Sequence, residues 1–560
     1  MCYNGRSFII LWRVAVIAAE GVSRQEPVYL SGTKDRVIIL FGEQNLLYFF
    51  VLEGKVMTEI YNSVANFNDK INTFVWGLPM LVLLVGTGIT MTYLTDFFQV
   101  THIGHWFKKT IGTVFKKDSK THDKSDKHSI SQFQSLCTAL AATVGTGNIA
   151  GVAGAILLGG PGAVFWMWVA AFFGMMTNYS ENVLGIYFRR RNMKGDWCGG
   201  AMYYLEDGLG GKKHMRVVGK ILAILFSFFA ILASFGIGNL AQVNTISANL
   251  NTTFNINPYL TGTVLVALVA LIVIGGLKRI ASVTERLVPF MVVIYLLGTI
   301  TIFCLHITKV GAIFGAIFKF AFGVKAVLGG AAGIAIKEVI TMGFKRGVFS
   351  NEAGLGSSVM VHSASNVREP VIQGMWGIFE VFADTIIVCT LTAFSILSSG
   401  AVDLKTGQIL TESGKETLVA EVFQNTFGPI GGYFVAVAIF MFAFSTVLGW
   451  SYYGTKSWEY LFGTKSTVIY KLVFTAIVFV SAIIPETHAK LPWDISDTFN
   501  GLMAIPNLIG VLALSGTVYK ITKNYINRRL KDKKKKPVPM LSYFPDIQRE
   551  AREAIENGEE

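Results

Sequence analysis

The sequence predicts an all-α polytopic membrane protein. Hydrophobic residues make up 52% of the 560 positions and charged residues only 15%, and the mean hydropathy is +0.50. This composition is too apolar for a soluble protein of that size. Apolar runs of roughly 20 residues, the helical length that crosses about 30 Å of hydrocarbon, recur along the chain. An outer-membrane barrel would show shorter alternating segments of about ten residues, so we expect helices.

Apolar runs alternate with polar breaks and give eleven expected spans. These lie near 71–98, 131–158, 161–189, 217–249, 259–277, 283–307, 327–362, 370–398, 417–455, 467–485 and 492–520. Lys and Arg gather in the breaks after the odd-numbered spans, whereas the break at 250–258 has none. The positive-inside rule therefore predicts a multi-pass protein of the inner (cell) membrane with a cytoplasmic C-terminus. The formal charge of +13 reflects this topology and does not indicate nucleic-acid binding.

The two ends of the chain differ from the spans. Residues 1–56 mix charges with broken apolar stretches, and Met57 opens a plausible amphipathic start, so we expect 1–56 to be an extension with a mis-assigned start. Residues 57–70 form a short N-terminal segment and 71–522 the transmembrane domain. We expect the charged tail at 523–560 to be a solvated cytoplasmic helix or a disordered end. Between the spans, we expect 309–325 to form an amphipathic helix on the outer surface.

Glycine clusters in the middle of two spans. Span 2 carries Gly145-Thr146-Gly147-Asn148, and span 7 carries the run from Gly347 to Ser358. Five spans separate the clusters, so 2–6 and 7–11 are equal sets that cross in opposite directions. This arrangement predicts a 5+5 inverted repeat with two broken helices and a binding site where they meet. Close helix packing is the alternative explanation, and it suits Gly151 and Gly154 better than the 145–148 run.

A break within the membrane exposes backbone N–H and C=O groups that need partners. The N–H groups and positive helix ends suit a carboxylate, whereas the carbonyls suit Na⁺ or an ammonium group. A small zwitterion and one cation would satisfy both. Among other intramembrane polar residues, Gln242 is a site candidate, and we expect Glu181 to lie near Arg189 to Arg191 as a structural group. Glu380 and Asp384 are expected to pair with Lys345 or Arg346. The five cysteines and eight histidines show no disulfide or metal spacing.

Three stretches resemble the alanine or glycine:cation symporter family from about Asn72 to Tyr519. They are LCTALAATVGTGNIAGVAGAILLGGPGAVFWMWVAAFFGM, KRGVFSNEAGLGSS and LGWSYYG. The resemblance implies a fold similar to the leucine-transporter type, with a ten-helix inverted repeat in spans 2–11 and one extra helix before it. It also implies a substrate carboxylate on the N–H groups of Thr146 and Gly147, oriented by Asn148, with Gln242 at the amino group. Phe349, Ser350, Thr446 and Trp450 would complete the pocket. Sodium would lie between the carbonyls of Ala141 and Val144 and the hydroxyls of Ser445 and Thr446.

These expectations give sodium-coupled import of alanine or glycine by alternating access. We expect no cofactor and no catalytic residues. The protein would lie in the lipid bilayer and need no obligate protein partner. Bulky Phe349 and Trp450 favour small substrates, although a hydrophobic pocket discriminates by only about 1–3 kcal/mol per methylene. The alternatives are a carrier for another small zwitterion, or a proton-coupled carrier that uses Glu352, Glu380 or Asp384. A channel would need rings of carbonyls or charges, and an enzyme would need converging catalytic groups.

Overall fold

The computed structural model describes residues 28–29, 37–39, 51–52, 55–116, 120–124, 126–322, 336–415, 417–485, 490–531 and 537–557. Most of the extension expected at 1–56, the start of span 7 and the lysine run 533–536 therefore lie outside the described residues. Contacts divide the chain into two units, Met1–Lys70 and Ile71–Glu560.

The first unit contains three short antiparallel strands in the order β1-β2-β3. They are β1 (Val28–Tyr29), β2 (Val37–Ile39) and β3 (Val51–Leu52). Val28 pairs with Ile39 and Val37 pairs with Leu52. Helix α2 (Lys55–Val75) begins in this unit and ends in the second.

The second unit is helical in its described residues, apart from a hairpin of β4 (Arg190–Arg191) and β5 (Trp197–Cys198). Its α-helices are α3 (Leu78–Leu94), α4 (Phe98–Thr101), α5 (Ile103–Lys109), α6 (Ile111–Val114), α7 (Gln132–Thr143), α8 (Ala150–Gly159), α9 (Gly162–Tyr187), α10 (Ala201–Tyr203), α11 (Arg216–Phe235), α12 (Ala241–Phe254), α13 (Pro258–Val273), α14 (Gly276–Leu305), α15 (Val310–Phe322), α16 (Ile336–Asn351), α17 (Val359–His362), α18 (Pro370–Val381), α19 (Thr390–Ser398), α20 (Leu418–Phe427), α21 (Pro429–Phe462), α22 (Thr467–Ala482), α23 (Lys490–Ala513), α24 (Ser515–Arg529) and α25 (Pro545–Glu556). Short 3₁₀ turns are η1 (Lys120–His122), η2 (Thr146–Asn148), η5 (Ile307–Lys309) and η7 (Thr464–Ser466), and π-helical segments are η3 (Tyr204–Leu209), η4 (Gly236–Leu240) and η6 (Phe382–Cys389).

Helices occupy every expected span, but their ends differ. The expected span 417–455 is divided at Gly428, whose positive φ of 68° ends α20 and lets α21 begin at Pro429. By length and apolar composition, five helices among the described residues could cross a membrane alone, or up to seven if each bent pair counts as one. The chain is therefore a helical protein with several apolar helices, and the count of eleven stays a prediction.

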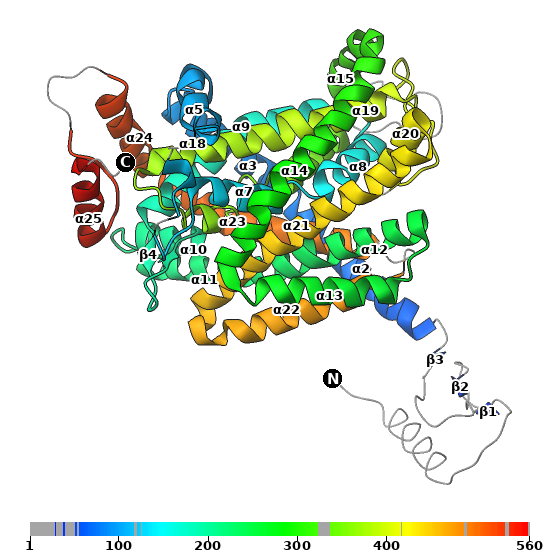
Figure 1. The fold of residues 1–560 in the computed structure, drawn as a ribbon, viewed down its shortest axis with the longest axis horizontal. Helices are drawn as coiled ribbons and strands as arrows, with labels where there is room; N and C mark the ends of the chain where they lie inside the picture. The colour runs from blue at the N-terminus through cyan, green and yellow to red at the C-terminus, as the bar shows by residue number, and fades with distance from the viewer. Residues whose placement is uncertain are drawn as a thin grey trace. The chain divides into compact units, whose positions relative to one another are not determined.

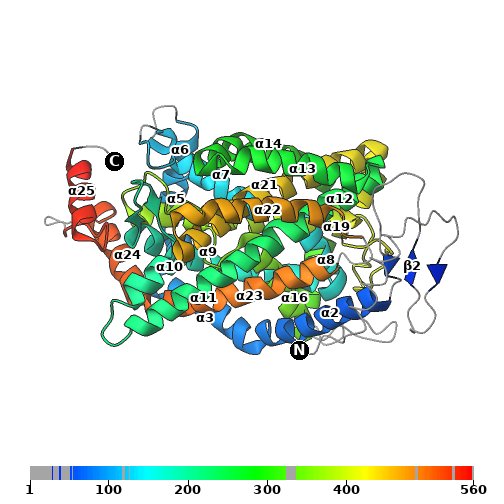
Figure 2. The same cartoon turned by 90° about the horizontal axis from the view of Figure 1, so that it is seen from below.

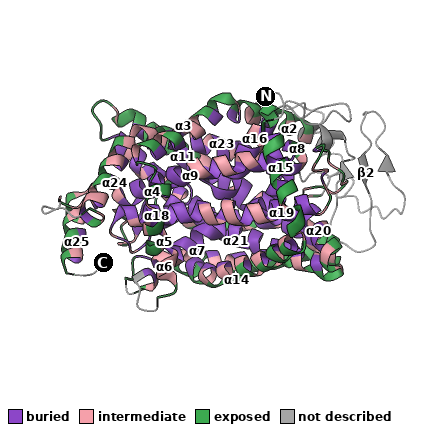
Figure 3. Cartoon of the chain, turned by 90° about the horizontal axis from the view of Figure 1, so that it is seen from above, coloured by how far each residue is buried: buried purple, intermediate pink, exposed green. Residues whose placement is uncertain are grey.

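The surface of the second unit is apolar along its outer helices. Phe290, Val293 and Leu297 of α14 are exposed, as are Val468 and Leu472 of α22. Figure 3 shows this contrast, because α21, α18 and α9 are mainly buried while α14 carries intermediate and exposed residues on its outer side. In water such a surface would be costly, whereas lipid tails solvate it.

Long helices run side by side along the bundle (Figure 2), with α11 between α22 and α23. Helix α9 packs against both α16 and α18, and α11 and α12 pack against α21. In Figure 1, α24, α25 and the β4–β5 hairpin lie at one end, and α15 and α20 lie at the other.

The C-terminal tail contains helix, which was one of the two expected alternatives, but parts of it contact the bundle. Tyr525 and Arg528 of α24 are buried, and Arg528 contacts the buried Glu369. Beyond the lysine run, the Tyr543 N–H donates to the Tyr187 carbonyl at 2.9 Å. The described part of the tail is therefore packed on the bundle, because its apolar face finds a partner there.

Candidate functional site

The first helix break lies where the Gly145 to Asn148 run predicted it. Helix α7 ends at Thr143, η2 makes one turn, and α8 begins at Ala150. The Asn148 side chain holds the break closed, because its Oδ1 accepts the Gly145 N–H at 3.0 Å. The break and its side chains are buried.

The second break lies between α16 and α17. Glu352 adopts a positive φ of 56°, which is uncommon for a residue with a side chain, and Gly354 and Gly356 follow at 91° and 72°. Asn351 Oδ1 accepts the Ala353 N–H at 3.0 Å and supports this turn. Residual strain of this kind is typical of functional sites.

The two breaks touch each other. A Cβ placed on Gly147 would lie 3.2 Å from both the Phe349 ring and the Ser350 Cα, and one on Gly145 would lie 2.3 Å from Thr446 Oγ1. Gly151, by contrast, has its nearest neighbour at 3.9 Å. Other chain segments therefore approach the backbone closely at 145 and 147 and not at 151, whereas the sequence led us to expect close packing at Gly151 in particular.

Gln242 lies at the first break. Its Oε1 accepts the Thr146 N–H at 3.3 Å, and its Nε2 donates to the Ile237 carbonyl at 3.0 Å, in the π-helical segment η4. The Thr146 hydroxyl is buried and has no hydrogen-bond partner within the described chain. A buried polar group of this kind is a binding candidate, because native proteins pair nearly all such groups.

The four residues expected to hold sodium are only partly assembled. Thr446 Oγ1 donates to the Ala141 carbonyl at 3.0 Å and joins α21 to α7. The Ser445 hydroxyl instead donates to the Phe442 carbonyl of its own helix at 2.8 Å. No hydrogen bond between described residues joins Ser445 to Ala141 or Val144, although all four are buried.

An aromatic pair and an ion pair cover one side of the breaks. The Phe349 ring stacks on Trp493 with centroids 5.2 Å apart, and the Arg346 guanidinium lies 5.6 Å and 5.7 Å from the two rings. Sequence reasoning missed Trp493 and the Asp497 that binds Arg346. An intramembrane carboxylate in span 11 was a signal that could have found Asp497.

Trp450 contacts the second break through Glu352. Its Nε1 donates to Glu352 Oε1 at 2.7 Å, and the Ser357 hydroxyl donates to the other Glu352 oxygen at 2.5 Å. The backbone of Gly238 approaches so closely that an added Cβ would meet the Trp450 Cβ at 2.2 Å. Trp450 therefore connects α21 to the second break and to η4.

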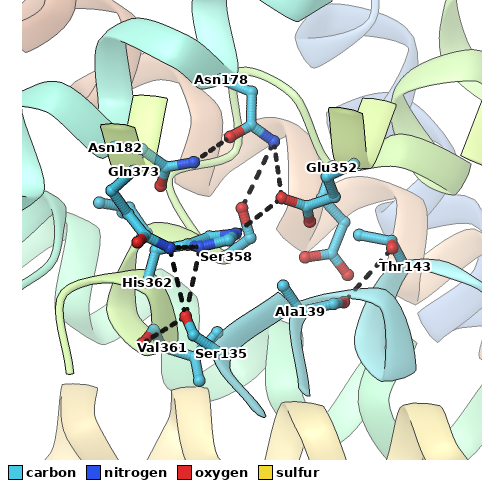
Figure 4. A network of polar contacts seen from close by, with 12 residues as sticks. Ser135, Ala139, Thr143, Asn178, Asn182, Glu352, Ser358, Val361, His362 and Gln373 are labelled. Atoms are coloured by element: carbon cyan, nitrogen blue, oxygen red, sulfur yellow. Dashed lines mark hydrogen bonds and ion pairs between the residues drawn. The ribbon is translucent and has the colours of Figure 1, made fainter. Parts of the chain in front are cut away.

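Two expected pairings of buried charges are wrong. Lys345 and Arg346 contact Asp497 at 2.8 Å and 3.0 Å, and not Glu380 or Asp384. Glu380 contacts His362 at 2.9 Å instead, and Figure 4 shows His362, Gln373, Ser135 and Asn178 gathered in one network. These residues meet because α9, α17 and α18 pack together, which no spacing in the sequence shows.

Glu181 is also paired differently from the expectation. It accepts a hydrogen bond from Asn507 of α23. Arg189, which sequence proximity suggested as a partner, donates to the carbonyls of Ser363, Ser365 and Val367. Arg189 lies beyond the end of α9 at Tyr187, so the helix does not place its side chain beside Glu181.

Two cavities have linings that lie outside the two breaks. One of about 770 Å³ is lined by residues of α12, α20 and α21, among them Asn244 and Gln424, and by Lys415, which precedes α20. Another of about 360 Å³ lies beside Trp197 and Tyr452. Neither lining includes a described residue of 144–149 or 349–358.

The chain is similar to known transporters over most of its length. Residues 61–539 match the sodium:alanine symporter family. The sodium/alanine symporter AgcS of Methanococcus maripaludis is 45% identical over 82% of this chain and 96% of its own. GlnT of Bacillus subtilis, named a probable sodium/glutamine symporter, is 35% identical over 82% of this chain and 90% of its own. A solved structure of MhsT with L-phenylalanine covers 71% of this chain and 99% of its own at 14% identity, with a TM-score of 0.46. The chain thus belongs to the sodium:alanine symporter family, and it is a multi-pass membrane transporter and not an enzyme.

Proposed function

We propose that this protein imports alanine or glycine together with Na⁺ by alternating access. The observation that carries the proposal is the contact between the two helix breaks at Gly147, Phe349 and Ser350. The close approach of the two breaks favours a small ligand over a bulky one. The Thr146 and Gly147 N–H groups are the proposed carboxylate site, Asn148 holds the break, and Gln242 takes the amino group. Thr446 and Trp450 are the proposed α21 side of the pocket.

The proposed sodium ligands are the Ala141 and Val144 carbonyls with the Ser445 and Thr446 hydroxyls. The 3.0 Å contact from Thr446 to the Ala141 carbonyl supports this assignment. Oxygen atoms are the ligands that hard cations prefer. Rotation of the Ser445 hydroxyl away from Phe442 would complete the set.

The proposed architecture is one extra helix followed by a 5+5 inverted repeat of eleven spans in total, with a cytoplasmic C-terminus. Helices in matching positions of the two sets contact each other. Helix α9 of the first set contacts α18 of the second, and both α11 and α12 of the first set contact α21 of the second. Contacts of this kind are expected around a pseudo-two-fold axis.

The test is uptake of radiolabelled alanine into proteoliposomes with an inward Na⁺ gradient or with K⁺ in its place. We expect accumulation that requires Na⁺ and is lost in Asn148→Ala. Excess unlabelled glycine should compete, whereas glutamine, the amino acid in the name of the Bacillus subtilis relative, should not. Uptake that persists without Na⁺ but collapses with an uncoupler would contradict sodium coupling. Competition by glutamine alone would contradict the substrate.

A further inference from the structure

The cavity of about 360 Å³ lies apart from the two breaks, at the end of the bundle that holds the β4–β5 hairpin (Figure 1). Segments far apart in the sequence form its wall, among them the residues before α7, the hairpin, the turn between α13 and α14, the last turns of α21 and the start of α22. The charge pattern of the sequence predicts that this end faces the cytoplasm. The function proposed above makes no use of this cavity.

Lysine side chains from different elements line the cavity. Lys456 belongs to α21, Lys471 to α22, and Lys194 to the loop between β4 and β5. Lys194 and Lys456 lie close enough for their positive charges to act on Lys471. The charged or titratable residues of the lining are Lys194, Lys278, Lys456, Lys471, His128, Asp196 and Glu459. Lysines therefore outnumber carboxylates, and the lining carries a net positive charge.

The carboxylates of the lining are already paired. Glu459 contacts Lys456 at 2.9 Å, and Asp196 contacts His128 at 3.2 Å. Among the described residues, no carboxylate forms an ion pair with Lys471, which is half-buried. A half-buried ammonium group has lost part of its hydration, so an anion in the cavity would stabilise it.

Tyr452 supplies a hydrogen-bond donor to the same cavity. Its side chain lines the cavity and is 4% exposed, and its buried hydroxyl forms no hydrogen bond with any described part of the chain. Native proteins pair nearly all such groups, so a polar partner from outside the chain belongs beside this hydroxyl. Tyr452 and Lys456 lie one helical turn apart on α21, on the same face, and the Lys456 ammonium is 5.8 Å from the centre of the tyrosine ring. The hydroxyl and the ammonium group can therefore bind one anion.

The apolar surface of the bundle begins beside this cavity. Leu277 and Ile280 of α14 belong to the lining. Leu472, which follows Lys471 in α22, is exposed, and so is Val468 one turn before it. A ligand with a phosphate at one end and acyl chains at the other could place its phosphate among the lysines and its chains on this apolar surface. Basic pockets between membrane helices on the cytoplasmic side typically bind lipid head groups.

We propose that this cavity binds the phosphate group of an anionic phospholipid. The Tyr452 hydroxyl and the Lys456 ammonium donate hydrogen bonds to the phosphate oxygens. Lys471 and Lys194 contribute positive charge, and the acyl chains lie along α13 and α22. A lipid bound in this way joins α21 and α22 to the turn between α13 and α14, so it stabilises this end of the bundle. The site is independent of the amino acid that the protein transports.

The test is titration of the delipidated, detergent-solubilised full-length protein with phosphatidylglycerol, with bound lipid counted by native mass spectrometry. We expect Lys471→Gln to weaken binding of the first lipid about fivefold, because one cation beside an anionic head group is lost. Tyr452→Phe should weaken it about tenfold, because a hydrogen bond to a charged group is lost. Since the Tyr452 hydroxyl has no partner within the described chain, this variant should fold like wild type.

Two control variants match these changes. Tyr453→Phe removes a neighbouring hydroxyl that is also buried and forms no hydrogen bond with the described residues, but Tyr453 is not part of the cavity lining. Lys465→Gln removes an exposed cation of η7 that also lies outside the lining. Both should keep the wild-type affinity. Equal affinities in wild type, Lys471→Gln and Tyr452→Phe would overturn the proposal, and so would an equal loss in the controls, which would indicate general attraction of lipid to the surface.

Further titrations distinguish the possible sources of the phosphate. Phosphatidylcholine, which has no net charge, should bind more weakly than phosphatidylglycerol and should not respond to Lys471→Gln. Inorganic phosphate at the concentration of the lipid should not displace phosphatidylglycerol, because it makes no contact with the apolar surface. Displacement at that concentration would overturn the assignment of a phospholipid.

Discussion

Arg346 and Asp497 form a buried two-contact ion pair between α16 and α23. Arg346 Nη1 lies 3.3 Å from Asp497 Oδ1, and Nη2 lies 3.0 Å from Oδ2. Lys345 adds a contact at 2.8 Å, so one carboxylate serves two cations. The side chains have exposures of 6%, 8% and 0% in the order Arg346, Lys345 and Asp497.

Asp497→Asn should destabilise the protein strongly. It leaves two buried cations without a counter-charge, and breaking a buried pair costs about 3–5 kcal/mol. We expect a clear fall in the Tm of the detergent-solubilised protein. Asp494→Asn is the control, since Asp494 is 25% exposed and its contact with Lys490 is 3.9 Å long. Equal Tm values for the two variants would contradict the importance of the pair.

Gly147→Ala should impair binding while Gly151→Ala should not. The added methyl group at 147 meets Phe349 and Ser350 at 3.2 Å, whereas at 151 its nearest neighbour is 3.9 Å away. Displacement of these groups should raise the KM for alanine by about tenfold or more, because small misplacements at a site are costly. Uptake kinetics of both variants measure this. Similar KM values would show that residue 147 lies outside the pocket.

Trp450→Phe should destabilise the second break. The change keeps an aromatic ring but removes the Nε1 donor to Glu352, and an unsatisfied buried acceptor costs about 1–3 kcal/mol. We expect a lower Tm and slower uptake. Trp458→Phe offers a comparison, because its Nε1 bonds the half-buried Ser466 and water can replace that partner. If Trp458→Phe has the larger effect, the role of Glu352 is refuted.

Glu206 should give a pH-dependent contribution to stability. Burial alone would raise its pKa, but hydrogen bonds from Lys220 and Tyr460 and the charge of Arg190 outweigh burial and hold the pKa below its ordinary value. A carboxyl with a lowered folded pKa stabilises the protein above its unfolded pKa, near 4.3, and loses this effect as pH falls.

Glu206→Gln should therefore lower the Tm at pH 7.5, by a free energy of no more than about 1 kcal/mol. The difference from wild type should shrink as the pH falls below about 4.3. Glu412→Gln, at an exposed position, should leave the Tm unchanged throughout. A difference that grows in acid would reverse the inferred sign.

The sequence determined the broad architecture and the place of the first break. The apolar runs predict helices at the positions where the structure has them, and adjacent glycines with an intramembrane Asn at 145–148 predict the break. These are local properties, since composition and spacing along one helix decide them.

Only the tertiary structure decided which side chains meet. The sequence led us to expect an ion pair between Asp384 and Lys345 or Arg346. Both cations instead contact Asp497, which lies 152 residues after Lys345 and 151 residues after Arg346. Trp493 reaches Phe349 only because α23 packs against α16. Such contacts depend on how helices rotate and cross, and side chains far apart in sequence carry no periodic signal of that packing. For this reason the contacts of Lys345 and Arg346 with Asp497 could not be predicted from the sequence.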